Sequence, residues 1–530
     1  MSTVANATEA ILLNGQWQSS SGLQSFQTEN PASGELLAAY YPVSSWKDCQ
    51  LALDAATVAA GQLRQLPPAK IAEFLEAYAA QLEANAETLV EIAHLETALP
   101  VKPRLSDVEL PRTTGQLRQA AEAARNGSWA QAVIDTKLGI RSCYEPIGPV
   151  CVFGPNNFPF AFNSVAGGDF AAAIAAGNPV IGKANTSHPG TTKKLAELAQ
   201  AAVEQTGLPA ATVQLIYRTS HEDGARLVAD PRVGAVGYTG SRHAGLVLKR
   251  AADAVGKPIY LELSSINPVV ILPGALAERC DEIVGQYVTS GLMGAGQFCT
   301  NPGLILLVKG ADSERFIDEV TAKYVAAAPG TLLSSSVRKS LTSAIETMSA
   351  GGAKLLCGGQ VVAGKCSVSN TLLRITARQF IAAPELFQTE AFGNAALIVV
   401  ADHVDDVAQA LCALEGNLTG CIYSSNQGAD DAAYRQLAPL LACRVGRLLN
   451  DKMPTGVAVS PAMNHGGPFP ATGHPGFTAV GIPTSLFRFA KLTCYDGVRP
   501  DRLPVLLQDK NPTGKTWRNI DLNWTTADVG

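Results

Sequence analysis

Residues 150–183 read VCVFGPNNFPFAFNSVAGGDFAAAIAAGNPVIGK, and this stretch decides the fold class. Its first four apolar residues, 150–153, predict a short strand, and residues 154–159 carry the Gly and Pro of a loop. Residues 161–176 predict a helix, and residues 179–183 predict the next strand. A helix between two strands indicates that the strands pair in parallel, because a parallel connection needs a crossover.

The same alternation continues toward the C-terminus. A helix is predicted over residues 191–206, and strands are predicted over residues 213–217, 235–238 and 259–263. Strands that alternate with helices predict a doubly wound parallel sheet of the α/β class, which binds ligands at the carboxyl ends of its strands. A second α/β region is expected from about residue 274 to residue 475.

On the N-terminal side, residues 48–96 and 107–125 are predicted to be helical, because their apolar residues recur at helical spacing. Residues 130–144 have strand character, and residues 484–490 (TSLFRFA) are another strand candidate. We expect these two strand segments to form an arm that reaches a neighbouring subunit.

The bulk composition excludes several function classes. A chain of 530 residues exceeds one hydrophobic core, so two or three domains are expected. The formal net charge is −5 and no block of Lys and Arg occurs, so no nucleic-acid partner is expected. No apolar run is long enough to span a membrane, and the N-terminal stretch MSTVANATEAILLNG lacks a signal-peptide pattern, so a cytoplasmic protein is expected.

Eleven cysteines are scattered along the chain without a CxxC pair or a metal-ligand spacing, so no metal site is expected. Cys299 is singled out, because the stretch GQFCTNPG places Gly on both sides of it and lets backbone approach a substrate. A thiolate there would be a nucleophile, and a buried turn cysteine is the alternative. Five other cysteines are expected to be buried small hydrophobes: Cys151, Cys280, Cys412, Cys421 and Cys443.

Three further motifs place polar groups at the ends of predicted strands. Glu262 lies in the apolar run LELSSINP, either as a general base or as a structural carboxylate paired with Lys257. Asn157, in NNFP, either donates its amide to an oxyanion or forms an Asx turn. The stretch YTGS, with Gly240 and Ser241, would place N–H groups and a hydroxyl where phosphate binds at a helix N-terminus, although no GxGxxG is present.

Taken together and in this order, these motifs resemble the aldehyde dehydrogenase superfamily over nearly the whole chain. The resemblance implies that Cys299 is the nucleophile, that Asn157 stabilises the oxyanion and that Glu262 is the base. It implies oxidation of an aldehyde to a carboxylic acid through a thiohemiacetal and a thioester. A CoA-acylating dehydrogenase, which needs no hydrolytic base, and a non-catalytic binding protein on the same fold are the alternatives.

The resemblance also implies a nicotinamide dinucleotide cofactor. Lys183 matches the lysine that holds the adenosine ribose, and Gly240 and Ser241 match the family's F-T-G-S turn. The stretch EAFG, with Glu390 and Phe392, matches the motif whose Glu holds the nicotinamide ribose.

NADP is expected in preference to NAD, which is the second choice. Thr186 stands three positions beyond Lys183, where NAD-preferring relatives carry a Glu that repels a 2′-phosphate. Arg218 follows a predicted strand and is expected either to stack on the adenine or to meet the phosphate.

As a fold, the resemblance implies an α/β architecture with three parts. A parallel-sheet dinucleotide-binding domain is expected over residues 1–129 and 146–273, and an α/β catalytic domain over residues 274–475. Residues 130–145 and 476–530 are expected to form an oligomerisation arm and tail, in a homodimer or a homotetramer.

Three departures from the family's pattern indicate a subfamily. Glu262 is followed by Leu-Ser-Ser in place of Leu-Gly-Gly, and Gly393 is followed by Asn in place of Pro. Glu262 lies 37 positions before Cys299 (299 − 262), a few more than in many members of the family. With SVAGGD, GQFCTNPG and HGGPFPA, these features resemble alpha-ketoglutaric semialdehyde (2,5-dioxovalerate) dehydrogenases and NADP-preferring fatty aldehyde dehydrogenases. The small-molecule substrate expected is an aliphatic aldehyde or 2-oxoglutarate semialdehyde. Phe160 and Phe162 are expected to line an apolar approach, and no arginine is identified for a substrate carboxylate.

Overall fold

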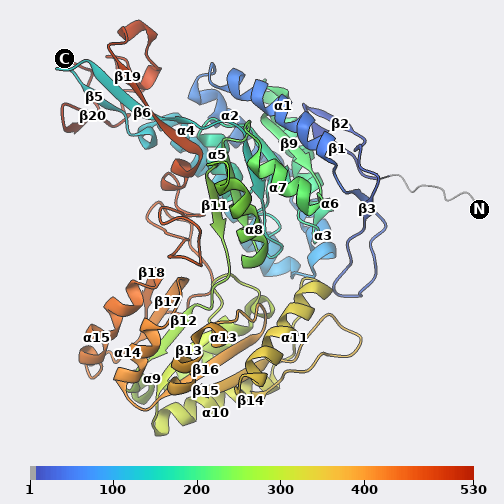
Figure 1. Cartoon of the computed structure of the whole chain (residues 1–530), viewed down its shortest axis with the longest axis vertical. Coiled ribbons are helices and arrows are strands. Elements are labelled where there is room, and N and C mark those ends of the chain that lie inside the picture. Colours follow the sequence, from blue (N-terminus) through green and yellow to red (C-terminus); the bar gives the residue numbers. More distant parts are fainter. Residues whose placement is uncertain (1–7) are drawn as a thin grey trace, which may run out of the picture.

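The computed structural model describes residues 8–530 as two α/β lobes and a projecting arm (Figure 1). The first seven residues of the N-terminal stretch, in which no signal peptide is expected, lie outside the described residues. In Figure 1 the upper lobe carries the first half of the chain, the lower lobe carries most of the second half, and the arm leaves the upper lobe near the C-terminus. No helix in residues 8–530 is both long and apolar enough to cross a membrane.

The sheet of the upper lobe confirms the predicted parallel arrangement. Its seven strands lie in the order β11-β10-β7-β8-β9-β1-β2, and the first five of them pair in parallel. The strands are β7 (Val150–Phe153), β8 (Val180–Lys183), β9 (Val213–Ile216), β10 (Ala235–Thr239), β11 (Ile259–Glu262) and the antiparallel edge strands β1 (Ile11–Leu13) and β2 (Gln16–Gln18); β3 (Ser25–Phe26) and β4 (Tyr41–Pro42) form a separate pair.

The helices of the upper lobe form two groups around this sheet and bury one large apolar core. The predicted N-terminal helices are confirmed. In the first group are α2 (Pro68–Ala84), α3 (Ala86–Thr97), η1 (Val101–Glu109), α4 (Leu110–Asn126), α5 (Gly168–Ala175) and α6 (Pro189–Thr206); in the second are α1 (Trp46–Leu63), η3 (Ala210–Thr212), α7 (His221–Ala229) and α8 (Arg242–Asp253).

The lower lobe is built on a second seven-stranded sheet, in the order β14-β15-β16-β13-β12-β17-β18. Alternate residues of β12 enter different apolar clusters, Val269 and Ile271 on one face and Val270 on the other, so both faces of the sheet are covered. The strands are β12 (Pro268–Ile271), β13 (Leu304–Val308), β14 (Lys354–Cys357), β15 (Thr371–Thr376), β16 (Ala395–Ala401), β17 (Asn417–Tyr423) and β18 (Val445–Asn450).

The helices of this lobe lie between its strands along the chain. They are α9 (Pro273–Leu292), η4 (Met293–Gly296), α10 (Ala311–Ala326), α11 (Ser335–Ala350), α12 (Ala377–Ala382), α13 (Pro384–Phe387), α14 (Val404–Cys412) and α15 (Asp431–Ala442). Cys412 ends α14 and Cys443 follows α15, and both are exposed. The prediction that these two cysteines are buried is therefore wrong, because a helix terminus faces solvent even when the helix interior does not. Cys151, Cys280 and Cys421 are buried as predicted.

The arm is a five-stranded sheet that joins segments far apart in the chain, in the order β19-β6-β5-β20-β21. Its elements are β5 (Val133–Asp135), β6 (Ile140–Pro146), β19 (Ala490–Asp496), β20 (Arg518–Ile520), β21 (Asn523–Thr525), η2 (Ser128–Ala130), η6 (Pro500–Arg502) and η7 (Val505–Leu507). Figure 1 shows β6 and β19 leaving the upper lobe side by side, as their antiparallel register requires.

Two predicted elements are shifted. The helix predicted over residues 161–176 begins only at Gly168, because the Asn163 side chain bonds to Pro159 O and to Val165 N and holds a turn there. The strand predicted over residues 484–490 is η5 (Thr484–Phe489), and β19 begins where it ends. In η5, Arg488 is 1% exposed and bonds to Asp169 of α5, so a tertiary ion pair decides the local conformation.

Candidate active site

Cys299 lies in a turn just after η4, between the two lobes of the chain. The backbone enters this turn through three positive φ values, 57° at Gly294, 56° at Ala295 and 70° at Gly296. A Cβ at Gly296 would lie 2.1 Å from the carbonyl oxygen of Gly393, so only glycine fits there. This close approach places the cysteine turn against the EAFG segment.

Cys299, His465 and Glu262 form a cluster in which the histidine and the glutamate are buried and the cysteine is half-buried. The Sγ of Cys299 lies 3.4 Å from His465 Nε2, and the same nitrogen lies 3.0 Å from Glu262 Oε1. Their ligand atoms all lie within 4.8 Å of one another, and the side chains of His465 and Glu262 are 1% and 2% exposed. The structure therefore adds an imidazole to the two predicted residues.

The surroundings keep the Cys299 thiol protonated at rest. Burial, and next the negative charge of Glu262, raise the pKa of the Cys299 thiol well above its usual range. A nucleophilic thiolate therefore requires that the proton leave when substrate arrives, and His465 Nε2 lies within reach of it.

Glu262 ends β11, the edge strand of the upper sheet. An isolated bridge pairs its backbone with Thr472, and this bridge brings the segment that carries His465 alongside the strand. Its Oε1 contacts His465, whereas its Oε2 is buried and has no hydrogen-bond partner among residues 8–530. One carboxylate oxygen is thus free to accept a proton from a water molecule.

Asn157 follows β7 in a loop that an ion pair holds in place. Its Nδ2 donates to Gln297 O at 3.0 Å, so the second N–H of the amide remains to meet an oxyanion. Its backbone carbonyl accepts from Arg104 Nη2 at 2.9 Å, and Arg104 pairs with buried Glu109. Glu109 also accepts from the backbone N–H of Phe160, so the loop is fixed at both ends.

The Asn267 side chain holds the cysteine turn through two hydrogen bonds to its backbone carbonyls. Its Nδ2 donates to Cys299 O at 2.8 Å and to Asn301 O at 2.9 Å. It adopts φ 47°, a left-handed conformation that Asn tolerates better than most residues. The Asn267-Pro268 dipeptide after the LELSS run was the available signal for it.

Lys183 and Arg218 lie at the carboxyl ends of the neighbouring strands β8 and β9. Burial, and then the charge of Arg218, lower the pKa of Lys183 to about 8. Within residues 8–530, the Lys183 ammonium donates only to Ala184 O, at 3.4 Å. Thr186 and Arg218 are exposed beyond these strand ends, so the structure brings the three residues to one edge of the sheet.

Gly240 and Ser241 lie at the next carboxyl end, after β10. The Ser241 side chain caps α8 and accepts from Ala244 N at 3.4 Å, so its hydroxyl is engaged by the helix. Gly240 N donates to Glu262 O at 3.1 Å, which ties this turn to the end of β11. The first turn of α8 therefore begins at the edge that Lys183 shares, with one of its N–H groups already capped by Ser241.

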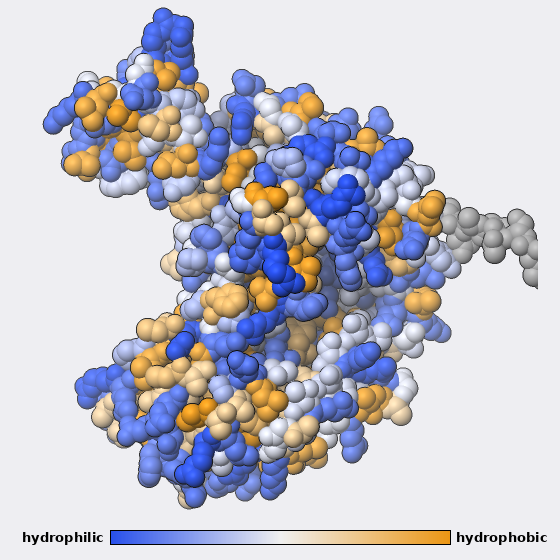
Figure 2. All heavy atoms as spheres, in the orientation of Figure 1, coloured by the Kyte–Doolittle hydropathy of each residue, from blue (hydrophilic) through white to orange (hydrophobic). Residues whose placement is uncertain are grey.

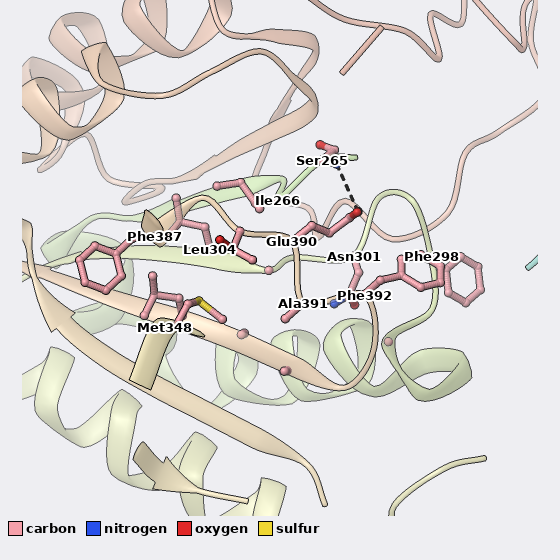
Figure 3. A pocket seen from close by; sticks show the side chains of 16 residues that line it. Ser265, Ile266, Phe298, Asn301, Leu304, Met348, Phe387, Glu390, Ala391 and Phe392 are labelled. Atoms are coloured by element: carbon pink, nitrogen blue, oxygen red, sulfur yellow. Dashed lines mark hydrogen bonds between the residues drawn. The ribbon is translucent and has the colours of Figure 1, made fainter. Parts of the chain in front are cut away.

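Glu390 and Phe392 come from the lower lobe and line a pocket whose lining residues all lie between 265 and 397 (Figure 3). Burial raises the pKa of Glu390, and its Oε1 accepts from Ser265 N at 3.2 Å, the bond drawn in Figure 3. Both residues line this pocket, together with Ile266, Asn301 and the cysteine turn.

The two predicted pocket aromatics separate. Phe162 packs in an apolar cluster with Phe158 and Phe298. The centroid of its ring lies 5.9 Å from that of the His465 ring. Phe160 is fully buried in the core of the upper lobe. Its predicted place in the substrate approach is therefore wrong, because consecutive turn residues at this loop face different cores.

Comparisons with known proteins give a family match and close relatives. A family model described as "Aldehyde dehydrogenase family" matches residues 17–463. The chain is 42% identical over 498 residues to alpha-ketoglutaric semialdehyde dehydrogenase 2 of Azospirillum brasilense, covering 91% of this chain and 93% of that protein. It is 36% identical over 453 residues to an alpha-ketoglutaric semialdehyde dehydrogenase of Acinetobacter baylyi, covering 83% and 85%.

Solved structures share the fold. A putative aldehyde dehydrogenase from Burkholderia cenocepacia superposes with a TM-score of 0.79 at 22% identity, over 92% of this chain and 97% of that chain. Lactaldehyde dehydrogenase from Escherichia coli gives a TM-score of 0.79 at 21% identity, over 92% and 98%.

Proposed function

Since this chain belongs to the aldehyde dehydrogenase family and oxidises an aldehyde with a nicotinamide dinucleotide, we propose that its substrate is 2-oxoglutarate semialdehyde. The observation that carries this proposal is the 42% identity, over 91% of the chain, to a protein named for that substrate. Uncharged aliphatic aldehydes are the second candidates, because the cluster around Phe162 offers an apolar wall.

In the proposed mechanism Cys299 attacks the aldehyde carbon after His465 Nε2 accepts the thiol proton. The imidazolium so formed lies against Glu262 Oε1, whose negative charge stabilises it. The free N–H of Asn157 donates to the oxyanion of the thiohemiacetal. A nicotinamide dinucleotide, when bound, would supply the hydride acceptor that converts the thiohemiacetal on Cys299 to a thioester.

Hydrolysis of that thioester is assigned to Glu262. Its unpartnered Oε2 accepts a proton from water, and the resulting hydroxide attacks the acyl carbon and releases the acid and the Cys299 thiolate. This free oxygen favours hydrolysis over transfer to CoA, which would need no base at this position.

The cofactor pocket is proposed to prefer NADP. A half-buried Lys183 with one long bond to a neutral carbonyl could hold an anionic or ribose oxygen. Thr186 adds a hydroxyl without negative charge. Arg218 would add a second positive charge at the same edge, and the turn at Gly240 and Ser241 would present the first-turn N–H groups of α8 that Ser241 does not cap to a phosphate. Glu390 and Phe392 would hold the nicotinamide end from the opposite lobe.

The domain boundaries given above and the role of the arm belong to the same proposal, as does a cytoplasmic location. Figure 2 shows hydrophobic side chains gathered on the projecting arm. Exposed large apolar residues of the arm support a contact with a second subunit in a homodimer or homotetramer. They include Val133, Leu138, Leu492, Val505, Trp517, Leu522 and Trp524.

A substrate panel tests the proposal. Initial rates are measured for 2-oxoglutarate semialdehyde, pentanal, a long aliphatic aldehyde and an aromatic aldehyde, each with NAD and with NADP. We expect the highest kcat/KM for the oxo-semialdehyde with NADP. Values at least tenfold higher for a long aliphatic aldehyde would overturn the substrate, and formation of acyl-CoA when CoA is added would overturn hydrolysis.

A further inference from the structure

Two arginines near the active site have no carboxylate partner. Arg112 lies in the first turns of α4 and Arg447 lies in β18, and neither forms a salt bridge with any residue in the part of the chain that the structure describes. Nearby Arg104 differs, because it pairs with Glu109. Two unpaired guanidinium groups in one region are unusual, since a buried charge is normally neutralised by a partner.

Arg112 is largely buried and only partly satisfied. Its Nη1 donates to Val457 O at 2.9 Å and its Nε to Gln116 Oε1 at 3.3 Å. Its Nη2 is buried and has no acceptor within residues 8–530. Burial lowers the pKa of Arg112, which expresses the cost of holding its charge there without a counter-ion.

Arg447 reaches the same short segment from the other side. Its Nη2 donates to Pro454 O at 2.9 Å and to Gly456 O at 3.2 Å, next to the carbonyl that binds Arg112. Its Nη1 has only the weak thioether acceptor of Met463, at 3.9 Å, and its Nε is buried without a partner in the described chain. The pKa of Arg447 is likewise lowered by burial.

A continuous set of contacts connects this pair with the nucleophile. The Cζ of Arg112 lies 5.3 Å from the centroid of the Phe162 ring, and that ring lies 5.9 Å from the His465 ring. His465 in turn contacts Cys299. The segment that both arginines bind also lies beside the nucleophile, because Gly456 N donates at 3.2 Å to the hydroxyl of Thr300, the residue after Cys299.

We propose that Arg112 and Arg447 form an anion subsite that binds the carboxylate at the far end of an aldehyde whose carbonyl carbon meets Cys299. This inference rests on the proposed function for the identity of the aldehyde. The two arginines give the place where the carboxylate of that aldehyde binds. A guanidinium with free N–H groups matches a carboxylate in geometry and charge. The aromatic cluster around Phe162 would cover the carbon chain between the two ends.

The experiment compares Arg112→Met and Arg447→Met with two matched controls. Arg118→Met lies on the same helix, where Arg118 forms an exposed pair with Glu83, and Arg444→Met lies just before the same strand. The substrates are 2-oxoglutarate semialdehyde and pentanal, which have the same number of carbons but differ in charge. A change in Cys299 reactivity or in folding lowers the oxidation rates of both aldehydes. Loss of the anion subsite lowers the rate for 2-oxoglutarate semialdehyde alone.

We expect each active-site variant to lose about 10- to 100-fold in kcat/KM for the charged aldehyde, mainly through KM, and to keep pentanal oxidation within about threefold. Both control variants should match the wild type. Equal losses for the two aldehydes, or no loss for either, would overturn the subsite.

A second measurement separates this inference from the choice of substrate. Glutarate is added as a non-reacting dianion, and its protection of Cys299 against iodoacetamide is measured. Protection that disappears in Arg112→Met and persists in Arg118→Met supports the subsite, whichever aldehyde is the better substrate. A preference for pentanal would refute the proposed substrate and leave the subsite standing. Protection that is absent from the wild type, or equal in both variants, would overturn the subsite.

Discussion

Replacement of Glu262 by Gln should make the resting Cys299 thiol more reactive while it slows turnover. The carboxylate raises the pKa of the Cys299 thiol, so its removal should shift thiolate formation to lower pH. The ligand atoms of the cluster lie within 4.8 Å of one another, and at an effective dielectric constant of about 20 two charges at that distance repel by about 3 kcal/mol.

That energy sets the expected size of the effect. Since about 1.4 kcal/mol corresponds to tenfold, the full repulsion is worth on the order of 100-fold in thiolate population. His465 lies between the two groups and screens part of it, so we expect at least a tenfold faster alkylation of Cys299 near pH 7 in Glu262→Gln.

The assay is the rate of iodoacetamide labelling of the cofactor-free protein between pH 6 and pH 10, followed by peptide mass spectrometry. Exposed Cys412 and Cys443 serve as internal standards, because the substitution should not alter their labelling. The same variant should give a burst of reduced cofactor followed by slow turnover, since an amide cannot take a proton from water. Labelling of Cys299 that is unchanged or slower than in the wild type would refute the electrostatic reasoning.

Four other substitutions or conditions test the remaining roles. Cys299→Ala should reduce aldehyde oxidation by several factors of ten while dinucleotide binding, measured by fluorescence titration, stays nearly intact; more than about a tenth of wild-type turnover would point to another nucleophile. His465→Gln should lower kcat about 10- to 100-fold and steepen the rise of rate with pH, because a charge-assisted hydrogen bond is lost; an unchanged pH profile would leave His465 a structural role. Thr186→Glu should weaken NADP binding at least tenfold and spare NAD, as calorimetry with both would show; equal losses would contradict the assignment. Affinity for NADP should fall as pH rises from 7 to 9, because Lys183, with its pKa lowered to about 8, loses the proton that favours a phosphate, while NAD affinity should change less; a flat NADP profile would remove Lys183 from phosphate binding.

Local sequence patterns were enough to predict the fold class and much of the site. The apolar runs at 150–153 and 179–183 became β7 and β8, because a short apolar run bounded by Gly and Pro has few other conformations. Cys299, Glu262 and Asn157 each stand in a short motif whose Gly, Pro or Asn residues fix the backbone around them. The roles of these three residues could therefore be predicted without knowledge of the side chains that contact them in the fold.

Only the tertiary structure decided which distant groups meet. His465 begins the HGGPFPA stretch, which supported the resemblance but gave no role to the imidazole. It joins the cluster because the bridge between Glu262 and Thr472 lays its segment against β11. The Arg104–Glu109 pair likewise acts on Asn157 from a separate helix. Such contacts depend on how sheets and loops pack over long sequence separations, which no local periodicity encodes.

The sequence by itself therefore determined the α/β class and the family, and it predicted the roles of three side chains, since these depend on residue type and near neighbours. It could not distinguish the paired Arg104 from the unpaired Arg112, because both are arginines at the start of one helical region. It placed Phe160 beside Phe162, whereas packing sends them to different cores. Pairing and burial are properties of the assembled lobes, because the free energy of a charge depends on what surrounds it in space.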